Sequence, residues 1–134
     1  MTSKPTHPVE LLSGAIATQE GWFVPGSMPS VRHNPGDLRY AGQVGAIKPA
    51  SVTPPPIATF VSNAAGVTAL CRQIWLQVAT GQTVREIIAQ WAPTTENDTT
   101  AYLADVLLWT GLPADTPILD LLPPLWQANQ EPRT

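Results

Sequence analysis

Apolar residues recur at helical spacing in four segments of this 134-residue chain, and residues that start or stop helices bracket each segment. A repeat of three to four residues places the apolar side chains on one face, and the bracketing residues fix where each helix begins and ends. The pattern predicts a mainly helical fold in one domain, which the chain length also favours. The expected helices span residues 8–20, 63–80, 84–92 and 99–110, followed by a short helix over about 117–122.

The residues at the helix ends carry the most specific local signals. Thr6 is expected to cap the first helix, with Pro8 in its first turn and Gly21 as its stop. Thr83, followed three residues later by Glu86, matches the capping-box pattern, in which each side chain bonds the other residue's backbone N–H.

The segment between the first two long helices has no helical pattern. Residues 21–36 are rich in aromatic residues, Gly and Pro, which are typical of turns rather than of a regular element. Residues 37–40 alternate between polar and apolar, and residues 57–61 could pair with them as a small β-hairpin. The connection contains a run of three prolines at 54–56, which lack the N–H that a sheet needs. The expected fold class is therefore α+β, mainly α, with a small β-hairpin after the first helix.

The folded domain is expected to span residues 8–122, between a flexible N-terminal tail at 1–7 and a C-terminal tail at 123–134. No apolar run is long enough to cross a membrane. The first residues lack the apolar core of a secretion signal, so the chain is expected to be made in the cytoplasm without a signal peptide.

Composition and charge exclude several classes of function. The net charge is −3, whereas proteins that bind nucleic acid usually present a basic stripe. Cys71 is the only cysteine, so no internal disulfide can form. The two histidines, His7 and His33, are too few and too isolated to indicate a zinc site. We therefore expect no metal and no cofactor.

Glu20 is the strongest candidate for a chemical role. Leu12, Ile16 and Glu20 are spaced four residues apart, so they share the face of the first helix that turns toward the core. A carboxyl there, with Trp22 and Phe23 beside it, is expected to be partly desolvated, and desolvation raises the pKa of a carboxyl group. A general acid needs a raised pKa because it must hold its proton near neutral pH.

A group of basic residues follows Glu20 in the sequence. Arg32, Arg39 and Lys48 fall close together, and only Asp37 opposes them. The group is either a solvated loop or a basic rim that faces a substrate. In a competing interpretation, Arg32 or Arg39 forms an ordinary salt bridge with Glu20.

Two blocks of sequence form a recognisable pattern when taken in order. The first combines residues 19–22 (Gln-Glu-Gly-Trp) with residues 34–39 (Asn-Pro-Gly-Asp-Leu-Arg), and the second combines residues 83–93 with residues 96–102. Together they resemble the lysozyme-like superfamily, and most closely the lytic transglycosylase or muramidase-like domains of phages and bacteria. The resemblance covers most of the chain. Asp37 stands where those domains usually have an asparagine.

The resemblance implies a two-lobed helical domain with a glycan-binding cleft between the lobes. It also implies cleavage of the β-1,4 bond between N-acetylmuramic acid and N-acetylglucosamine, with Glu20 protonating the leaving oxygen. Glycosidases commonly use a second carboxylate, for which Asp37 and Glu96 are the candidates. Lytic transglycosylases work with one glutamate, which then acts as a base while a sugar hydroxyl closes an anhydro ring. The choice between hydrolysis and transglycosylation stays open.

The same resemblance assigns further residues to the substrate. In related lytic transglycosylases a tyrosine in the place of Tyr102 approaches the cleft, although its position on an apolar helical face fits core packing equally well. Trp91 could stack on a sugar ring, but it ends an amphipathic stripe and is expected in the core. The expected substrate-binding residues are Trp22, Asn34, Arg39, Tyr40, Asn97 and Tyr102.

The partner implied by the resemblance is the glycan strand of peptidoglycan. The protein would then act on the cell wall, in the periplasm or after delivery by a phage. Two other interpretations compete with this one. In the first, a lysozyme-like fold binds glycan without cleaving it, or serves as a structural module of a phage particle or secretion machine. In the second, the chain is a helical interaction protein whose Glu20 only forms an ion pair. The sequence does not indicate the oligomeric state.

Overall fold

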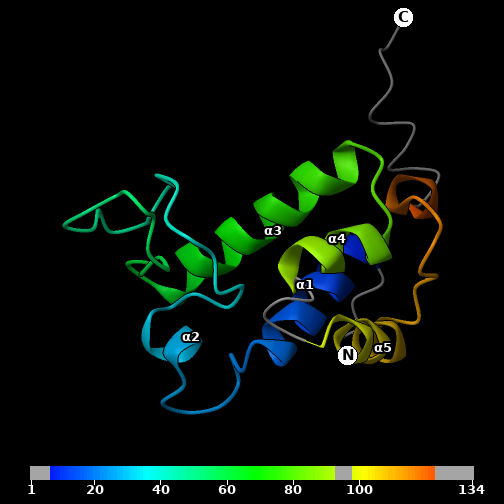
Figure 1. Ribbon diagram of the computed structural model, residues 1–134, viewed down its shortest axis with the longest axis horizontal. Coiled ribbons are helices and arrows are strands. Elements are labelled where there is room, and N and C mark those ends of the chain that lie inside the picture. The colour runs from blue at the N-terminus through cyan, green and yellow to red at the C-terminus, as the bar shows by residue number, and fades with distance from the viewer. Residues whose placement is uncertain (1–6, 93–97, 123–134) are drawn as a thin grey trace, which may run out of the picture.

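A computed structural model describes residues 7–92 and 98–122 of the chain. α1 packs against both α3 and α5, α4 packs against α5, and the 3-10 helix η1 packs against α3. In Figure 1, α1 lies at the centre of this helical part, and residues 37–60 form loops at the N-terminal end of α3. The elements of the described residues are α1 (Pro8–Gln19), α2 (Met28–Val31), α3 (Asn63–Ala79), α4 (Val84–Trp91), α5 (Thr99–Thr110) and η1 (Ile118–Leu121).

The long helices lie where the sequence predicts them, and the fold is mainly helical as expected. The cap of α1 is the exception among the predicted caps. His7, not Thr6, occupies the N-cap position, and its Nδ1 accepts a hydrogen bond from the Val9 N–H at 3.2 Å. A histidine ring nitrogen can replace a hydroxyl oxygen here because both accept a hydrogen bond from the exposed N–H groups of a first turn. Thr6 itself lies outside the described residues.

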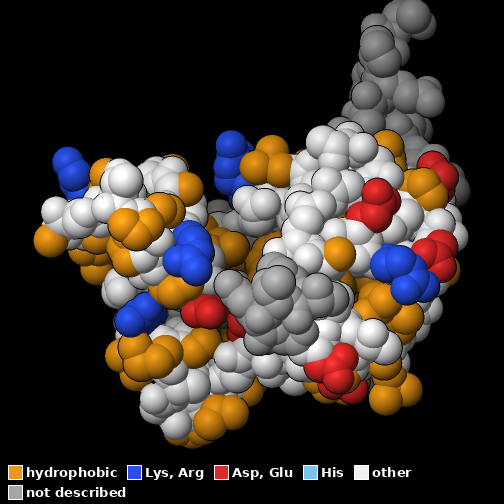
Figure 2. Space-filling model, viewed as in Figure 1, with side chains coloured by type: hydrophobic (Ala, Val, Ile, Leu, Met, Phe, Trp, Pro, Cys, Tyr) orange, Lys and Arg blue, Asp and Glu red, His pale blue; other side chains and the backbone are white. Residues whose placement is uncertain are grey.

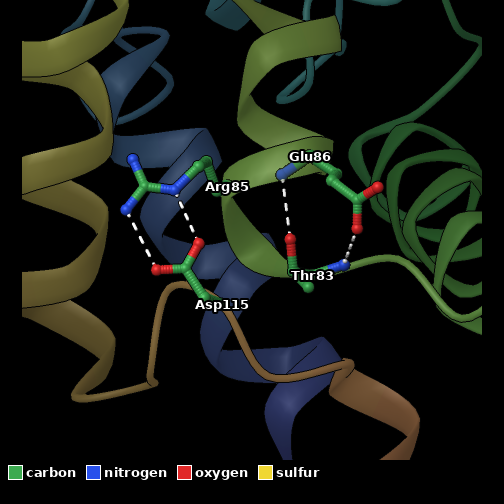
Figure 3. A network of polar contacts seen from close by, with 4 residues as sticks. All are labelled: Thr83, Arg85, Glu86 and Asp115. Carbon is green, nitrogen blue, oxygen red and sulfur yellow. Dashed lines mark hydrogen bonds and ion pairs between the residues drawn. The ribbon is translucent and has the colours of Figure 1, made fainter.

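The predicted capping box at the start of α4 is present. The Thr83 hydroxyl accepts from the Glu86 N–H at 3.2 Å, and Glu86 Oε1 accepts from the Thr83 N–H at 3.0 Å (Figure 3). The same helix carries Arg85, whose guanidinium donates to Asp115 through two hydrogen bonds of 2.7 and 3.1 Å. These contacts fix the start of α4 and join it to the segment that precedes η1.

Thr83→Ala is expected to lower the free energy of unfolding by about 1 kcal/mol, because it removes the side-chain partner of the Glu86 N–H. Arg85→Ala, two residues further on, is the matched control. Its ion pair with Asp115 is exposed, so its loss is expected to cost less than the loss of the cap. Urea unfolding of both variants measures the two costs. An equal cost for the two variants would contradict this ranking.

The prediction that residues 21–36 hold no regular element is wrong in one place. Met28–Val31 form the single helical turn α2, capped by the Ser27 side chain, which accepts a hydrogen bond from the Ser30 N–H at 3.3 Å. Pro29 occupies the first turn, where its missing N–H costs nothing. A cap followed by a proline is the same start signal that predicts α1. Here it is surrounded by turn residues, which obscured it.

The predicted β-hairpin is not formed as a pair of strands in the described residues. Arg39 and Ile57 pair in one isolated antiparallel bridge. The Ala58 N–H donates to the Leu38 carbonyl at 2.8 Å, and the Tyr40 N–H donates to the Pro56 carbonyl at 2.7 Å. The two segments therefore meet in the expected direction but pair at one position. On one side the prolines at 54–56 have no N–H to extend the ladder, and on the other the Thr59 carbonyl accepts from the Ile47 N–H instead.

Two hydrophobic clusters fill the interior. The larger is built from α1, α3, α4, α5 and η1, and includes the fully buried Leu12, Ile16 and Ile74. The smaller gathers Phe60 and Ala69 with side chains of the loop segments. Because Ala69 and Ile74 both belong to α3, this helix runs along both clusters. It therefore holds the loop region in a fixed position against the helical region.

Candidate active site

A cleft of about 740 Å³ lies between the loop region and the helices. Its walls come from the end of α1, from residues 36–43 and 57 of the loop region, and from α3 and α4. The charges differ between the two sides: Figure 2 shows basic side chains gathered over the loop region and acidic side chains spread over the helical region. The residues that line the cleft are Glu20, Gly36, Asp37, Leu38, Arg39, Ala41, Gln43, Ile57, Gln73, Gln77, Gln90 and Trp91.

Glu20 occupies the C-cap of α1, at the inner edge of this cleft. Its N–H still donates to the Ile16 carbonyl at 2.9 Å, so its side chain continues the face that carries the buried Leu12 and Ile16. The chain then turns away at Gly21, whose φ of 86° is unfavourable for other residues. The helical register thus carries a half-buried carboxyl from the core side of α1 into the cleft.

Tyr102 contacts this carboxyl from α5. Its hydroxyl donates a hydrogen bond to Glu20 Oε2 at 2.8 Å, although 82 residues separate the two in the chain. Tyr102 is buried in the larger cluster, and its burial raises the pKa of the phenol, as does the nearby negative charge of Glu20. The phenol therefore stays protonated and acts as a fixed donor. The packing of α5 on α1 positions it.

The pKa of Glu20 lies above its ordinary value of 4.5. Burial is the main cause, because it disfavours the charged form of a carboxyl group. The Tyr102 hydrogen bond opposes burial by stabilising the carboxylate, and the negative charge of Asp37 adds to the rise. A carboxyl in this setting keeps its proton to a higher pH than a solvated glutamate does.

Tyr102→Phe is expected to raise the pKa of Glu20 further, since it removes the hydrogen bond that stabilises the carboxylate. A carboxyl-carbon NMR titration of Glu20 in both proteins measures the change. Tyr40→Phe is the matched control, because Tyr40 packs in the smaller cluster and does not line the cleft. An unchanged or lowered pKa in Tyr102→Phe would show that the hydrogen bond does not stabilise the carboxylate.

Asp37 supplies a second carboxylate on the opposite wall. It is half-buried, and its φ of 51° lies in the left-handed region that Asp and Asn tolerate better than most residues do. Its N–H donates to the Asn34 carbonyl at 3.1 Å, which closes the turn around Pro35 and Gly36. The same turn is held to α4, because Trp91 Nε1 donates to the Gly36 carbonyl at 3.0 Å. Asp37 is therefore held in place relative to Glu20.

Asn34, expected to bind substrate, has a structural role instead. Its side chain is fully buried, and its Nδ2 donates to the carbonyls of Leu38 and Ala58 at 2.9 and 2.8 Å. Its Oδ1 accepts from the Leu38 N–H at 2.9 Å. Both polar atoms of the side chain are therefore hydrogen-bonded to backbone groups of the loop region, which have no β-ladder to pair with. Asn34 thus holds the cleft wall that carries Asp37.

The remaining predicted residues are divided between the cleft and the core. Arg39 is exposed, lines the cleft, and donates from Nη1 to the Pro55 carbonyl at 3.1 Å. Trp22 packs against the larger cluster and Tyr40 against the smaller one, and neither is among the residues that line this cleft. Phe23 is 68 % exposed and does not help to desolvate Glu20. Asn97 and Glu96 lie outside the described residues.

The competing ion pair of Glu20 with an arginine does not form. Among residues 7–92 and 98–122, the one salt bridge joins Arg85 and Asp115. The polar partner of Glu20 is the neutral Tyr102. Trp91 packs against the larger cluster, as expected, and it also lines the cleft.

The cleft is also lined by three glutamines that were not among the predicted site residues: Gln73, Gln77 and Gln90. A signal for one of them is present in the sequence. Gln77 lies next to Val78 on the stripe that continues from Leu70 and Ile74, so it falls on a face of α3 that is otherwise apolar. A polar side chain in such a stripe needs hydrogen-bond partners, and this need identifies it as a candidate site residue.

No family model, curated protein or solved structure matches this chain. In the part of the chain that the structure describes, no group of three or more His, Cys, Asp or Glu side chains is arranged to hold a metal ion. Over the same residues, no helix combines the length and the apolar character needed to cross a membrane.

Proposed function

We propose that this chain cleaves the β-1,4 bond between N-acetylmuramic acid and N-acetylglucosamine in peptidoglycan, with Glu20 as the general acid. The observation that carries the proposal is the setting of Glu20: a half-buried carboxyl with a raised pKa, opening onto a large cleft that also holds Asp37. The proposal includes a lysozyme-like arrangement of two lobes, in which the two hydrophobic clusters form the cores and the cleft lies between them.

Each residue in the site then has a defined task. Glu20 gives its proton to the glycosidic oxygen, so the leaving sugar departs as a neutral alcohol. Positive charge develops on the sugar ring that remains, and the nearby carboxylate of Asp37 stabilises it. After the transfer, Tyr102 donates to the newly charged Glu20 and stabilises it. Glu20 can then accept a proton back from the group that attacks the sugar.

The nature of that attacking group divides the proposal into two chemistries. If water attacks, the enzyme is a muramidase and its products carry reducing ends. If a hydroxyl of the muramic acid attacks, the enzyme is a lytic transglycosylase and its products carry 1,6-anhydro ends. The half-buried carboxylate of Asp37 could act as the base that positions the attacking water, or it could stabilise the positive charge on the sugar ring.

The experiment incubates the full chain with purified peptidoglycan and analyses the soluble fragments by mass spectrometry. Disaccharide-repeat fragments cut after N-acetylmuramic acid are expected, and their ends identify the chemistry. Asp37→Asn removes the second carboxylate from the cleft and places there the asparagine that is usual in the resembling domains. It is expected to slow release by about 10-fold or more in a muramidase that uses Asp37, and to leave release unchanged in a transglycosylase that works with Glu20 alone. Binding of peptidoglycan without any released fragment would contradict the proposal and favour a non-catalytic glycan-binding module.

The proposed site of action is the cell wall. The partner is the glycan strand, and the protein reaches it in the periplasm or as part of a phage. Arg39, which lines the cleft from the loop region, can attract the carboxylates of a peptidoglycan chain.

A further inference from the structure

Gln77 has a hydrogen-bonding atom with no partner at the cleft wall. Among the described residues, Gln77 Oε1 is the one buried side-chain nitrogen or oxygen atom without a hydrogen bond. The residue is only 6 % exposed and lines the same cleft as Glu20. A buried acceptor without a donor is unfavourable in a folded protein. An atom of this kind in a cleft wall is therefore a candidate contact for a ligand that supplies the missing donor.

The amide of Gln77 is held by its neighbours. Gln77 Nε2 donates to Gln90 Oε1 at 2.9 Å, and Gln90 Nε2 donates to Gln82 Oε1 at 2.9 Å. This chain of three amides uses one N–H of Gln77 Nε2 and leaves Oε1 without a donor. The acceptor is consequently pre-positioned, because turning the Gln77 amide alone would bring its oxygen against Gln90 Oε1.

The surroundings of Gln77 indicate a neutral ligand. The cleft residues contributed by α3 and α4 are Gln73, Gln77, Gln90 and Trp91, and none of them carries a charge. The Trp91 ring is held in place by its bond to the Gly36 carbonyl, so it offers a fixed apolar surface. Fixed amides beside a fixed aromatic ring suit a sugar, which has polar edges and apolar faces. Charged ligands would find no counter-ion on this wall.

We propose that Gln77 Oε1 accepts a hydrogen bond from the acetamido N–H of an N-acetylated sugar bound in the cleft, and that Gln90 is the positioning residue that holds Gln77. The assignment rests on the proposed function, because it specifies a sugar subsite in the cleft that contains Glu20. An acetamido group provides one directional N–H donor, which matches one fixed acceptor. A sugar hydroxyl shares this donor chemistry, so the experiment compares the two groups.

The test uses the Glu20→Gln variant, so that the ligand stays intact, and two oligosaccharides. Tetra-N-acetylchitotetraose carries the acetamido group, and cellotetraose carries a hydroxyl in its place. Binding is followed by NMR through the side-chain amide signals of Gln77 and Gln90 and the indole signal of Trp91. Chitotetraose is expected to shift these signals and to bind about 3- to 10-fold more tightly than cellotetraose, the range of one hydrogen bond.

Two further substitutions, each made in the Glu20→Gln variant, separate the role of Gln77 as acceptor from the role of Gln90 as the residue that holds it. Gln77→Met keeps the shape of the side chain and is expected to weaken chitotetraose binding about 3- to 10-fold and to abolish the preference over cellotetraose. Gln90→Met, at an exposed position, is expected to reduce the same preference through Gln77. Gln19→Met is the control, because Gln19 lies on α1 and does not line the cleft.

The proposal would be overturned if Gln77→Met bound chitotetraose with unchanged affinity and unchanged preference over cellotetraose. It would also be overturned if the variant lost affinity equally for both sugars, because the donor to Gln77 would then be a hydroxyl group. Absence of chitotetraose binding in a folded Glu20→Gln variant would also overturn it. Failure of the proposed function gives a different result: wild-type protein that binds chitotetraose through Gln77 but releases nothing from peptidoglycan.

Discussion

Glu20→Gln is expected to slow the clearing of a peptidoglycan suspension by about 10²–10⁴-fold, the usual contribution of a general acid. Glutamine has nearly the same shape and can still accept the hydrogen bond from Tyr102, but it cannot transfer a proton to the glycosidic oxygen. The fall in turbidity, measured at equal protein concentration, gives the two rates. Full clearing by the variant would remove Glu20 from the catalytic role.

The matched control for this loss is Glu10→Gln, which changes the same residue type on the same helix. Glu10 is exposed in the first turn of α1, far along the helix from the cleft, and its substitution is expected to leave clearing unchanged. Both variants should show a cooperative thermal transition, which confirms that any loss of activity is not a loss of fold.

The stability of Glu20→Gln also has a predicted pH dependence. The folded protein binds the Glu20 proton more tightly than the unfolded chain does, because the pKa of Glu20 is raised in the fold. The carboxyl therefore destabilises the fold at neutral pH, and this cost disappears as the pH falls below 4.5. The variant is expected to melt at a higher temperature than wild type at pH 7 and to lose this advantage at pH 3–4. A lower melting temperature than wild type at pH 7 would contradict a raised pKa.

Asn34→Ala is expected to lower the free energy of unfolding by about 2–4 kcal/mol. The substitution removes three hydrogen bonds from a fully buried position and leaves the carbonyls of Leu38 and Ala58 without that donor. The cost is that of backbone polar groups that lose a buried partner. Urea unfolding measures the loss.

Two variants control for the Asn34 prediction. Asn63→Ala removes an exposed amide that contacts His33 Nδ1, and it is expected to cost less than about 1 kcal/mol. Asn34→Asp keeps the acceptor for the Leu38 N–H but loses both donors, so its cost should lie near that of Asn34→Ala. If Asn34→Ala were as stable as Asn63→Ala while glycan binding was lost, the residue would contact substrate rather than support the loop.

The helices could be predicted from the sequence because their signals are local. Thr83 and Glu86 form a capping box with each other, and Asp98 caps α5, since its side chain accepts a hydrogen bond from the Ala101 N–H at 3.0 Å. These contacts span three residues and need no tertiary partner. The loop region is different. Its conformation depends on a buried asparagine that bonds backbone groups up to 24 residues away, and no local pattern contains that information.

The candidate site was predictable in the same way: features set by local helical register could be predicted, and features set by distant contacts could not. Helical register alone places Glu20 on the core side of α1. Asp37 was a candidate only through the resemblance, and residues 21–36, which include α2, separate it from Glu20. Trp22 and Tyr40 lie close to these residues in sequence, but their side chains pack into the two hydrophobic clusters. Proximity along a chain does not determine which way a side chain points outside regular structure. The contact between Tyr102 and Glu20 arises only when α5 packs on α1.

A carboxyl-carbon NMR titration of Glu20 in the wild-type protein tests most directly whether this carboxyl is held as a proton donor in the cleft. The predicted result is a midpoint clearly above 4.5, the ordinary value for glutamate, because burial and Asp37 together outweigh the Tyr102 hydrogen bond. A midpoint at or below 4.5 would mean that Glu20 is a stabilised carboxylate, as in an ordinary ion pair, and would contradict its role as the general acid.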